Sequence, residues 1–112
     1  MSIPTGEISA EFIQGMRNRM EVSYCKYGPI KNAYPHKVSA IASLEQRLKR
    51  YIETGNTEWL MDVANFAMIE FMLPSHPQAH FRSTESHESP GRESHAEGTT
   101  SKSNSELEEG LP

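Results

Sequence analysis

The most informative part of the chain is SLEQRLKRYIETGNTEWLMDVANFAMIEF, residues 43–71. Apolar residues recur at helical spacing on both sides of Gly55, which predicts two helices joined by a very short turn. Glycine commonly ends a helix in the left-handed conformation, and Asn56 or Thr57 can cap the helix that follows. Helices joined so closely are expected to pack antiparallel as a helical hairpin.

Outside this pair, the same spacing predicts one further helix and no strand. The three helices cover about residues 5–24, 36–54 and 57–72, with Thr5 as the cap of the first. Residues 25–35 are predicted to form a loop, because Gly and Pro interrupt the pattern there. The expected fold class is therefore all-α, a small bundle of three main helices.

The third predicted helix is apolar on nearly every side, which is typical of a helix at the centre of a domain or shared between subunits. Its apolar residues are Trp59, Leu60, Val63, Ala64, Phe66, Ala67, Ile69, Phe71 and Met72. A folding unit of this size has little material for a core of its own. We therefore expect a homo-oligomer, and the core helix of a monomeric bundle is the alternative with about equal weight.

Composition divides the 112 residues at about residue 82. Residues 83–112 contain seven Glu against Arg92 and Lys102, a net charge of −5. We predict a helical domain over residues 1–82 and a disordered acidic tail over residues 83–112, because so polar a segment cannot bury enough apolar surface to fold. The domain itself has a net charge of +1, so no bulk field indicates binding to nucleic acid.

The single cysteine and the longest apolar segment indicate the cellular compartment in which the protein is expected. Cys25 is the only cysteine, which excludes a disulfide within the chain and a cysteine-based zinc site. The first residues lack the basic and apolar segments of a signal peptide. The apolar stretch at residues 63–73 is broken by Asn65 and Glu70 and is too short to span a membrane. We expect a cytoplasmic protein that does not enter a membrane.

Several polar residues stand on helix faces that otherwise pack. Glu58, Asp62 and Asn65 share one face of the third helix by their spacing, and Glu45 lies at the margin of the apolar stripe of the second. Carboxylates from two helices can supply the hard oxygen ligands of Mg²⁺, which activates water and neutralises phosphates. The alternative is structural: Glu45 pairs with a cation of its own helix in solvent, and Asp62 pairs with an arginine from another helix.

The predicted loop between the first two helices is rich in Tyr and Lys. Tyr27 can stack on a base and Lys26 can meet a phosphate, so a nucleotide is one candidate ligand. The alternative is that the tyrosines close one end of the bundle and the lysines remain in solvent. No glycine-rich phosphate loop or Ser–His–Asp set is visible in the sequence.

Four segments together resemble small phage and actinobacterial proteins of the all-α nucleotide pyrophosphohydrolase group, which includes the MazG-like proteins. They are KYG at 26–28, LEQRLKRY at 44–51, TGN at 54–56 and EWLMDVANFAMIEF at 58–71. The resemblance covers about residues 12–71. It implies a helical, oligomeric enzyme that uses Mg²⁺ to cleave nucleoside triphosphates into monophosphate and pyrophosphate.

In that group the metal ligands come from an E-x-x-E pair on one helix and an E-x-x-D pair on a later one. Glu45 takes the place of the first acid and Asp62 that of the later aspartate, while Leu48 and Trp59 stand where their partners are expected. Glu58, four residues before Asp62, lies on the same face. The resemblance therefore implies that Glu45 and Asp62 are catalytic, that both bind Mg²⁺ together with Glu58, and that the substrate is bound by Lys26, Tyr27 and Asn65.

Two functions follow as expectations. The first is a MazG-like nucleoside triphosphate pyrophosphohydrolase or nucleotide-binding protein of phage origin, acting in the host cytoplasm. The second is a catalytically inactive helical module that sequesters a nucleotide or binds a host protein, as phage counter-defence proteins do. A helical oligomer whose third helix is mainly an assembly surface is a further alternative.

Overall fold

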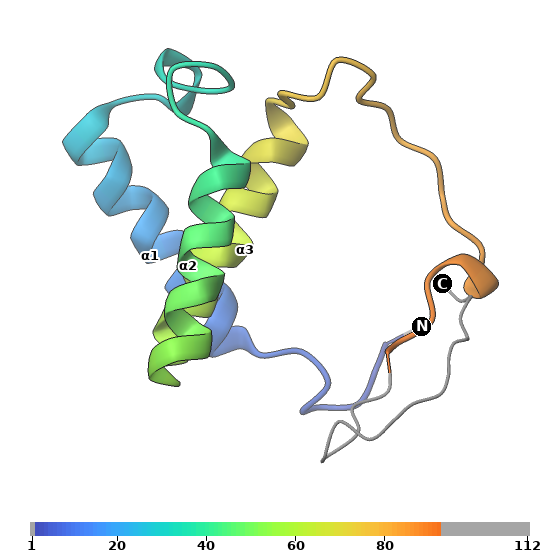
Figure 1. Ribbon diagram of the computed structural model, residues 1–112. Coiled ribbons are helices and arrows are strands. Elements are labelled where there is room, and N and C mark those ends of the chain that lie inside the picture. Colours follow the sequence, from blue (N-terminus) through green and yellow to red (C-terminus); the bar gives the residue numbers. More distant parts are fainter. Residues whose placement is uncertain (1, 93–112) are drawn as a thin grey trace. The chain divides into compact units, whose positions relative to one another are not determined.

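The computed structural model of the chain describes residues 2–92. Over these residues it contains helices and no strand, so the predicted all-α class with three main helices is confirmed (Figure 1). The α-helices are α1 (Ala10–Tyr27), α2 (Ala40–Thr54) and α3 (Glu58–Met72), and the 3₁₀ turns are η1 (Ile30–Asn32) and η2 (Ser86–Glu88). The chain divides into two units, residues 1–79 and 80–112. Residues 93–112 of the predicted tail lie outside the described part.

The start of α1 differs from the prediction. The helix begins at Ala10, and the hydroxyl oxygen of Ser9 caps it by accepting a hydrogen bond from the Phe12 amide at 2.9 Å. The prediction of a cap at Thr5 is wrong, because the next residue, Gly6, has a φ of 103°. An L-residue helix cannot pass through that conformation, so the chain turns here instead.

The end of α1 also differs from the prediction. Residues 25–27, expected in a loop, form the last turn of the helix, which ends at Gly28. The Gly28 amide donates a hydrogen bond to the Tyr24 carbonyl at 2.8 Å, and its φ of 81° suits glycine alone among common residues. The Tyr and Lys side chains near this end are therefore carried on a rigid helix.

Both ends of the connection between α2 and α3 follow local rules. α2 begins at Ala40 rather than near residue 36, because the Ser39 hydroxyl accepts a hydrogen bond from the Ala42 amide at 3.0 Å. Gly55 ends the helix in the left-handed conformation, as predicted. Of the two candidate caps for α3, the Asn56 side chain is the one that accepts a hydrogen bond from the Glu58 amide, at 3.0 Å.

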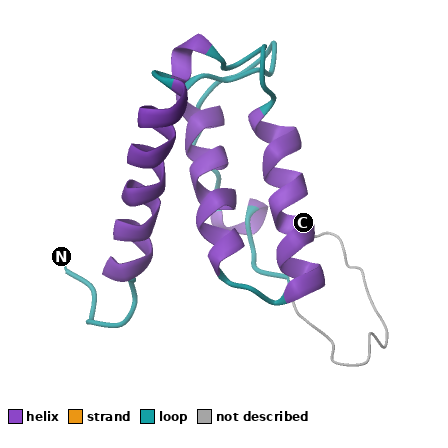
Figure 2. Ribbon diagram, turned by 90° about the vertical axis from the view of Figure 1, so that its left-hand side faces the viewer, coloured by secondary structure: helices purple, strands orange, loops and turns teal. Residues whose placement is uncertain are grey.

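α3 packs against both other helices, most extensively against α2 (Figures 1 and 2). α1 approaches α3 at Gly15, where an added Cβ would lie 2.5 Å from Sδ of Met61. A side chain at that position would force Met61 to move, so glycine permits the close approach of the two helices.

Within residues 2–92 very few side chains are removed from solvent. The buried ones are Ala40, Asn65 and Ile69, at 2%, 5% and 4% exposure, and α1 contributes none. Large apolar side chains such as Ile52 and Phe71 are instead more than 70% exposed. This interior is unusually small for a helical unit of its length. None of the described helices combines the length and the apolar character needed to cross a membrane.

The described residues of the second unit contain one ordered turn. Around η2 the Glu85 amide donates a hydrogen bond to the Glu88 carboxylate at 2.8 Å, and Arg82 pairs with the same carboxylate at 3.0 Å. The hydrogen bond from the Glu85 amide, followed by that from Arg82, lowers the pKa of Glu88 below its usual range. The sequence pattern did not predict this turn.

Candidate functional site

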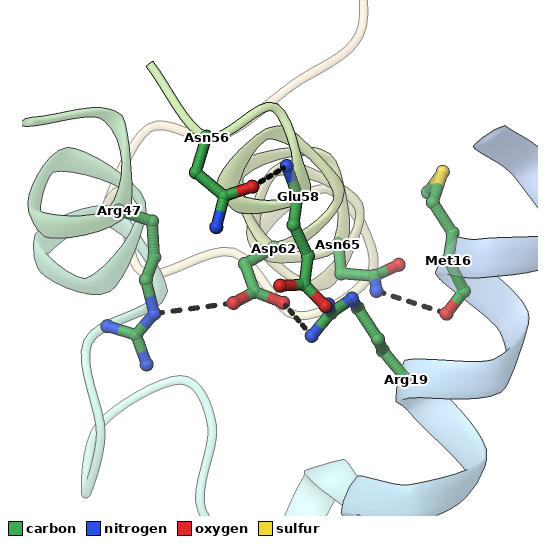
Figure 3. Close-up of polar contacts among 7 residues, drawn as sticks. All are labelled: Met16, Arg19, Arg47, Asn56, Glu58, Asp62 and Asn65. Carbon is green, nitrogen blue, oxygen red and sulfur yellow. Dashed lines mark hydrogen bonds and ion pairs between the residues drawn. The ribbon is translucent and has the colours of Figure 1, made fainter. Parts of the chain in front are cut away.

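Asp62 lies between two arginines that come from the two other helices (Figure 3). Arg19 of α1 lies 3.5 Å from one carboxylate oxygen, and Arg47 of α2 lies 3.6 Å from the other. Arg19 also pairs with Glu58, one turn earlier on α3. The structural alternative for Asp62, a pair with an arginine of another helix, is thus the arrangement found. The Asp62 side chain is 23% exposed, so water screens these pairs only in part.

Arg47 makes a second kind of contact with α3. Its guanidinium carbon lies 5.3 Å from the ring centroid of Phe66 and 6.0 Å from that of Trp59. A cation at this distance from an aromatic face is attracted by the ring quadrupole. Arg47 is therefore held both by its charge and by its planar group, and the half-buried ring of Phe66 lies against α2.

Asn65 is the one buried polar side chain of the described part, at 5% exposure. Its amide nitrogen donates a hydrogen bond to the Met16 carbonyl of α1 at 3.1 Å (Figure 3). Its oxygen, Oδ1, is buried and accepts no hydrogen bond. A buried acceptor without a partner costs about 1–3 kcal/mol, so the position is unfavourable unless something occupies the acceptor.

An inner cavity of about 420 Å³ lies beside this network. The side chains that give it chemical character are Arg19, Tyr27, Tyr34, Arg47, Asn65 and Phe66. Burial raises the pKa of the Tyr34 hydroxyl, and the charge of Arg47 partly opposes this, so Tyr34 stays a neutral donor at physiological pH. The residues that line the cavity therefore supply guanidinium donors, aromatic rings and the Asp62 carboxylate, together with Asn65, whose Oδ1 is buried and unpartnered.

An outer groove of about 580 Å³ adjoins the inner cavity, and Arg19, Ser23, Tyr27 and Asp62 line both. It is more open and has Lys26 and Glu58 among its lining residues. The predicted substrate-binding residues Lys26, Tyr27 and Asn65 thus all border one or other of the two spaces. Tyr27 is 75% exposed, which leaves its ring accessible.

The structure does not bring the three predicted Mg²⁺ ligands together. Glu58 and Asp62 both border the outer groove, but Glu45 is exposed and lines neither space. Glu45 and Arg47 are two positions apart and therefore point to different sides of α2, and it is Arg47 that reaches Asp62. Across residues 2–92, no three His, Cys, Asp or Glu side chains lie close enough to share a metal ion.

Arg19 and Arg47 are the functional candidates that the sequence pattern did not single out. Arg19 is 43 positions from Asp62 in the chain, and no local spacing rule connects residues so distant. The only available signal was a general one, namely that an acid within an apolar run needs a partner. That signal predicts a cation but does not identify which one.

No protein-family model, curated protein or solved structure matches the chain. The resemblance to the MazG-like group therefore stays a prediction, supported by the four sequence segments alone. The chemistry of the site has to be inferred from the side chains themselves. They can bind a planar group between rings and hydrogen-bond an anion, and the two carboxylates of the outer groove are already paired with arginine.

Proposed function

We propose that this protein is a binding module without catalysis, which holds a nucleotide in the inner cavity. The observation that carries the proposal is Asn65, which lines a cavity together with two guanidinium groups and whose Oδ1 is buried without a hydrogen-bond partner. Ligand pockets typically combine apolar walls with a few converging polar groups in a volume of about 300–1,000 Å³, and the inner cavity has both properties.

Each part of a nucleotide has a counterpart in the cavity. The exocyclic amine of a base is a donor that suits the Asn65 oxygen, and the rings of Tyr27, Tyr34 and Phe66 suit the flat face of a base. A guanidinium group can donate two hydrogen bonds to one phosphate. Arg19 is the arginine nearer to the outer groove, where Lys26 adds a further positive charge.

The local charge balance favours a ligand with few phosphates. Arg19 and Arg47 already pair with Glu58 and Asp62, so these four side chains have no net charge. Lys26, which lines the outer groove, brings the sum for the five side chains to only +1. A triphosphate brings about four negative charges into such a site with little to offset them, whereas a monophosphate matches it better. A nucleoside monophosphate is therefore the proposed ligand.

The Mg²⁺-dependent pyrophosphohydrolase is the second candidate, and one observation favours it. Glu58 and Asp62 border the same groove as Lys26 and Tyr27, so two acids and two predicted substrate contacts face one space. Metal binding there requires the two carboxylates to leave Arg19 and Arg47, and Glu45 would remain outside the site. Binding of a host protein in place of a nucleotide is the other form of the non-catalytic proposal.

The scaffold of the site belongs to the same proposal. The three-residue connection at 55–57 and the extensive contact between α2 and α3 support a helical hairpin as its rigid part. The very small interior supports self-association of the chain.

Titration of the full chain by isothermal calorimetry tests the ligand. The probes are adenosine, adenosine monophosphate, adenosine triphosphate with Mg²⁺, and pyrophosphate. We expect the monophosphate to bind more tightly than the nucleoside, the triphosphate or pyrophosphate. Absence of heat for every probe at about 1 mM, a concentration that detects even weak binding, contradicts the nucleotide proposal. Release of pyrophosphate from the triphosphate contradicts the non-catalytic proposal and supports the pyrophosphohydrolase in its place.

A matched pair of arginine variants locates the site. Arg47→Gln removes the guanidinium in the cavity, and Arg50→Gln makes the same change three positions along α2, where the side chain is exposed. We expect Arg47→Gln to weaken binding of the monophosphate at least about tenfold, the value of one charged hydrogen bond, and Arg50→Gln to leave it unchanged. Equal effects of the two variants indicate non-specific charge attraction and contradict the site.

Asn65→Leu tests the observation on which the proposal rests. The change removes the unpartnered oxygen and keeps the volume of the side chain. The variant loses the hydrogen bond to the Met16 carbonyl but also the cost of burying the unpartnered Asn65 oxygen. Because the two changes offset each other, we expect the free energy of unfolding to change by no more than about 1 kcal/mol. Binding of the monophosphate is expected to fall. Full retention of binding by a folded Asn65→Leu variant excludes Asn65 as a contact.

A further inference from the structure

α3 has a third side that its two neighbouring helices leave largely open, with Ala67 and Phe71 exposed and Leu60 and Ala64 half-buried. α1 contacts the side of Asn65, and Arg47 of α2 contacts the side of Trp59 and Phe66. The remaining side carries, at helical spacing, Leu60, Ala64, Ala67 and Phe71. Its centre is made of small residues, and Phe71 at its end is 73% exposed. No charged residue interrupts this stripe.

α2 carries a matching stripe on the adjoining flank. Ile41, Leu48 and Ile52 repeat at helical spacing and are 42%, 39% and 72% exposed. The opposite flank of α2, with Ser43 and Arg47, lines the inner cavity together with residues of α1. On both helices the apolar stripe therefore lies away from α1. We call the combined surface the outer apolar face, which consists of Ile41, Leu48, Ile52, Leu60, Ala64, Ala67 and Phe71.

The size of this face is large compared with the interior. Ile41, Leu48, Ile52 and Phe71 together leave roughly 400 Å² in water, taking about 180 Å² for one whole large apolar residue. That equals the largest apolar patch of a typical monomer and is about half of one side of a standard interface. The buried apolar residues of the described part are only Ala40 and Ile69. Covering the outer apolar face removes more large side chains from water than the interior does.

The rim of the face has charges of both signs. Glu45, Lys49 and Glu53 follow one another at spacing of four on α2, next to the apolar stripe. In a two-fold assembly with the two α2 helices antiparallel, a register centred between Glu45 and Lys49 places Glu45 of each chain opposite Lys49 of the partner subunit. A mixed rim of this kind suits an identical surface, because each copy supplies both the positive and the negative partners.

We propose that a second copy of this chain covers the outer apolar face, so that α2 and α3 of both chains share one core. The face belongs to the helices that contain the small interior, and it needs cover whenever the chain is folded. A second copy supplies that cover at the chain's own concentration. The inference is independent of the nucleotide, since the outer apolar face and the inner cavity lie on different sides of α3.

The oligomeric mass and its dependence on one exposed aromatic residue test the proposal. Light scattering coupled to size-exclusion chromatography is expected to give a dimer for the full chain. Phe71→Glu is expected to give the monomer mass, and Tyr24→Glu, a matched change at a 62% exposed aromatic residue on α1, is expected to stay dimeric. A monomeric wild-type chain, or a Phe71→Glu variant that remains dimeric, overturns the proposal.

Thermal unfolding of the wild-type chain gives a second readout that needs no variant. Because unfolding of a dimer releases two chains, the Tm is expected to rise by several degrees when the concentration rises about 100-fold. A Tm that does not change with concentration overturns the proposal. If Phe71→Glu is unfolded and Tyr24→Glu is folded, the result supports it, since a 73% exposed side chain is dispensable in a lone chain and only a partner makes it essential.

Discussion

The two sides of α3 differ in composition: the side that faces α1 and α2 mixes polar residues with Phe66 and Ile69, whereas the opposite side is apolar. The side that faces α1 and α2 carries Asp62 and Asn65, which meet two arginines and a backbone carbonyl. The side that faces solvent carries an uninterrupted apolar stripe that ends in Phe71. In a self-sufficient three-helix bundle we expect an apolar inner side and a polar outer side, because burial of apolar surface is the main favourable term in folding.

This difference assigns two tasks to different sides of α3, namely fixing how the helices meet and supplying apolar surface for burial. The inner side specifies how the helices meet, since each charge and amide has few acceptable partners, and it leaves the Asn65 oxygen without a hydrogen-bond partner. The apolar outer side supplies the area that the interior lacks. One helix is thereby proposed to support a binding site on one side and an assembly surface on the other.

The largest expected effect comes from comparing Ile69→Ala with Phe71→Ala. Ile69 is 4% exposed, so its truncation is expected to destabilise the protein by about 2–4 kcal/mol through lost burial and a residual cavity. In a lone chain Phe71→Ala costs almost nothing, whereas in the proposed dimer its cost approaches that of Ile69→Ala. Urea unfolding measures the loss of unfolding free energy in each variant. Similar losses indicate that a partner covers Phe71, and a loss only for Ile69→Ala indicates that Phe71 stays in solvent.

A smaller effect is expected from Asp62→Ala, which breaks the inner side. The variant leaves Arg19 and Arg47 close together without their shared carboxylate, and partial exposure of all three side chains limits the cost to about 1–3 kcal/mol. Glu21→Ala, at an exposed acid of α1 outside the arginine network, is the control and is expected to stay within about 0.5 kcal/mol of the wild type. Equal stability of the two variants in urea unfolding means that the arginine network does not hold the helices together.

The smallest effect concerns the C-terminal end of the inner side, where Glu70 accepts hydrogen bonds from the Ser75 amide at 2.7 Å and from its hydroxyl at 2.9 Å. These two bonds, the amide first, lower the pKa of Glu70 below its ordinary value. The lowered pKa stabilises the fold above the ordinary range of Glu, and this contribution is lost as the pH falls through the lowered pKa.

Unfolding measured at several acidic pH values checks the role of Glu70. The wild type is expected to lose stability between about pH 5 and pH 3, and Glu70→Gln is expected to show a shallower loss over that range. Glu21→Gln, at an exposed acid of α1, is the control and should reproduce the wild-type slope. If both variants follow the wild-type curve, Glu70 does not couple the end of α3 to the segment that follows.

Much of the fold follows from short-range patterns. The three helices and the glycine at the end of α2 were predicted because apolar spacing and backbone preference depend on neighbouring residues alone. The boundaries of α1 were not, because Gly6 and Gly28 are ordinary loop residues until their positive φ values are known. A helix that starts at Ser9 and one that starts at Thr5 have nearly the same pattern, since both residues are good caps.

The candidate site was predicted in its parts but not in its connections. Asp62 and Asn65 were identified because a polar residue in an apolar run is costly and needs a reason to be there. Which atoms satisfy them depends on the approach of α1 to α3 at Gly15, a contact between residues far apart in the chain. That approach brings Arg19 to Asp62. Because α2 reaches Asp62 through Arg47, Glu45 points elsewhere, and Asp62 and Glu58 pair with arginine instead of forming the expected metal site.

Helix formation in this chain is thus a local property of the order of its residues, because each backbone amide of a helix bonds to the carbonyl only four residues earlier. The partners of Asp62 and the vacant acceptor of Asn65 arise from packing, because they require three helices to meet at one place. The apolar stripe that ends in Phe71 is visible in the order of residues. Its exposure is not, since exposure depends on which sides of α3 the other two helices leave open.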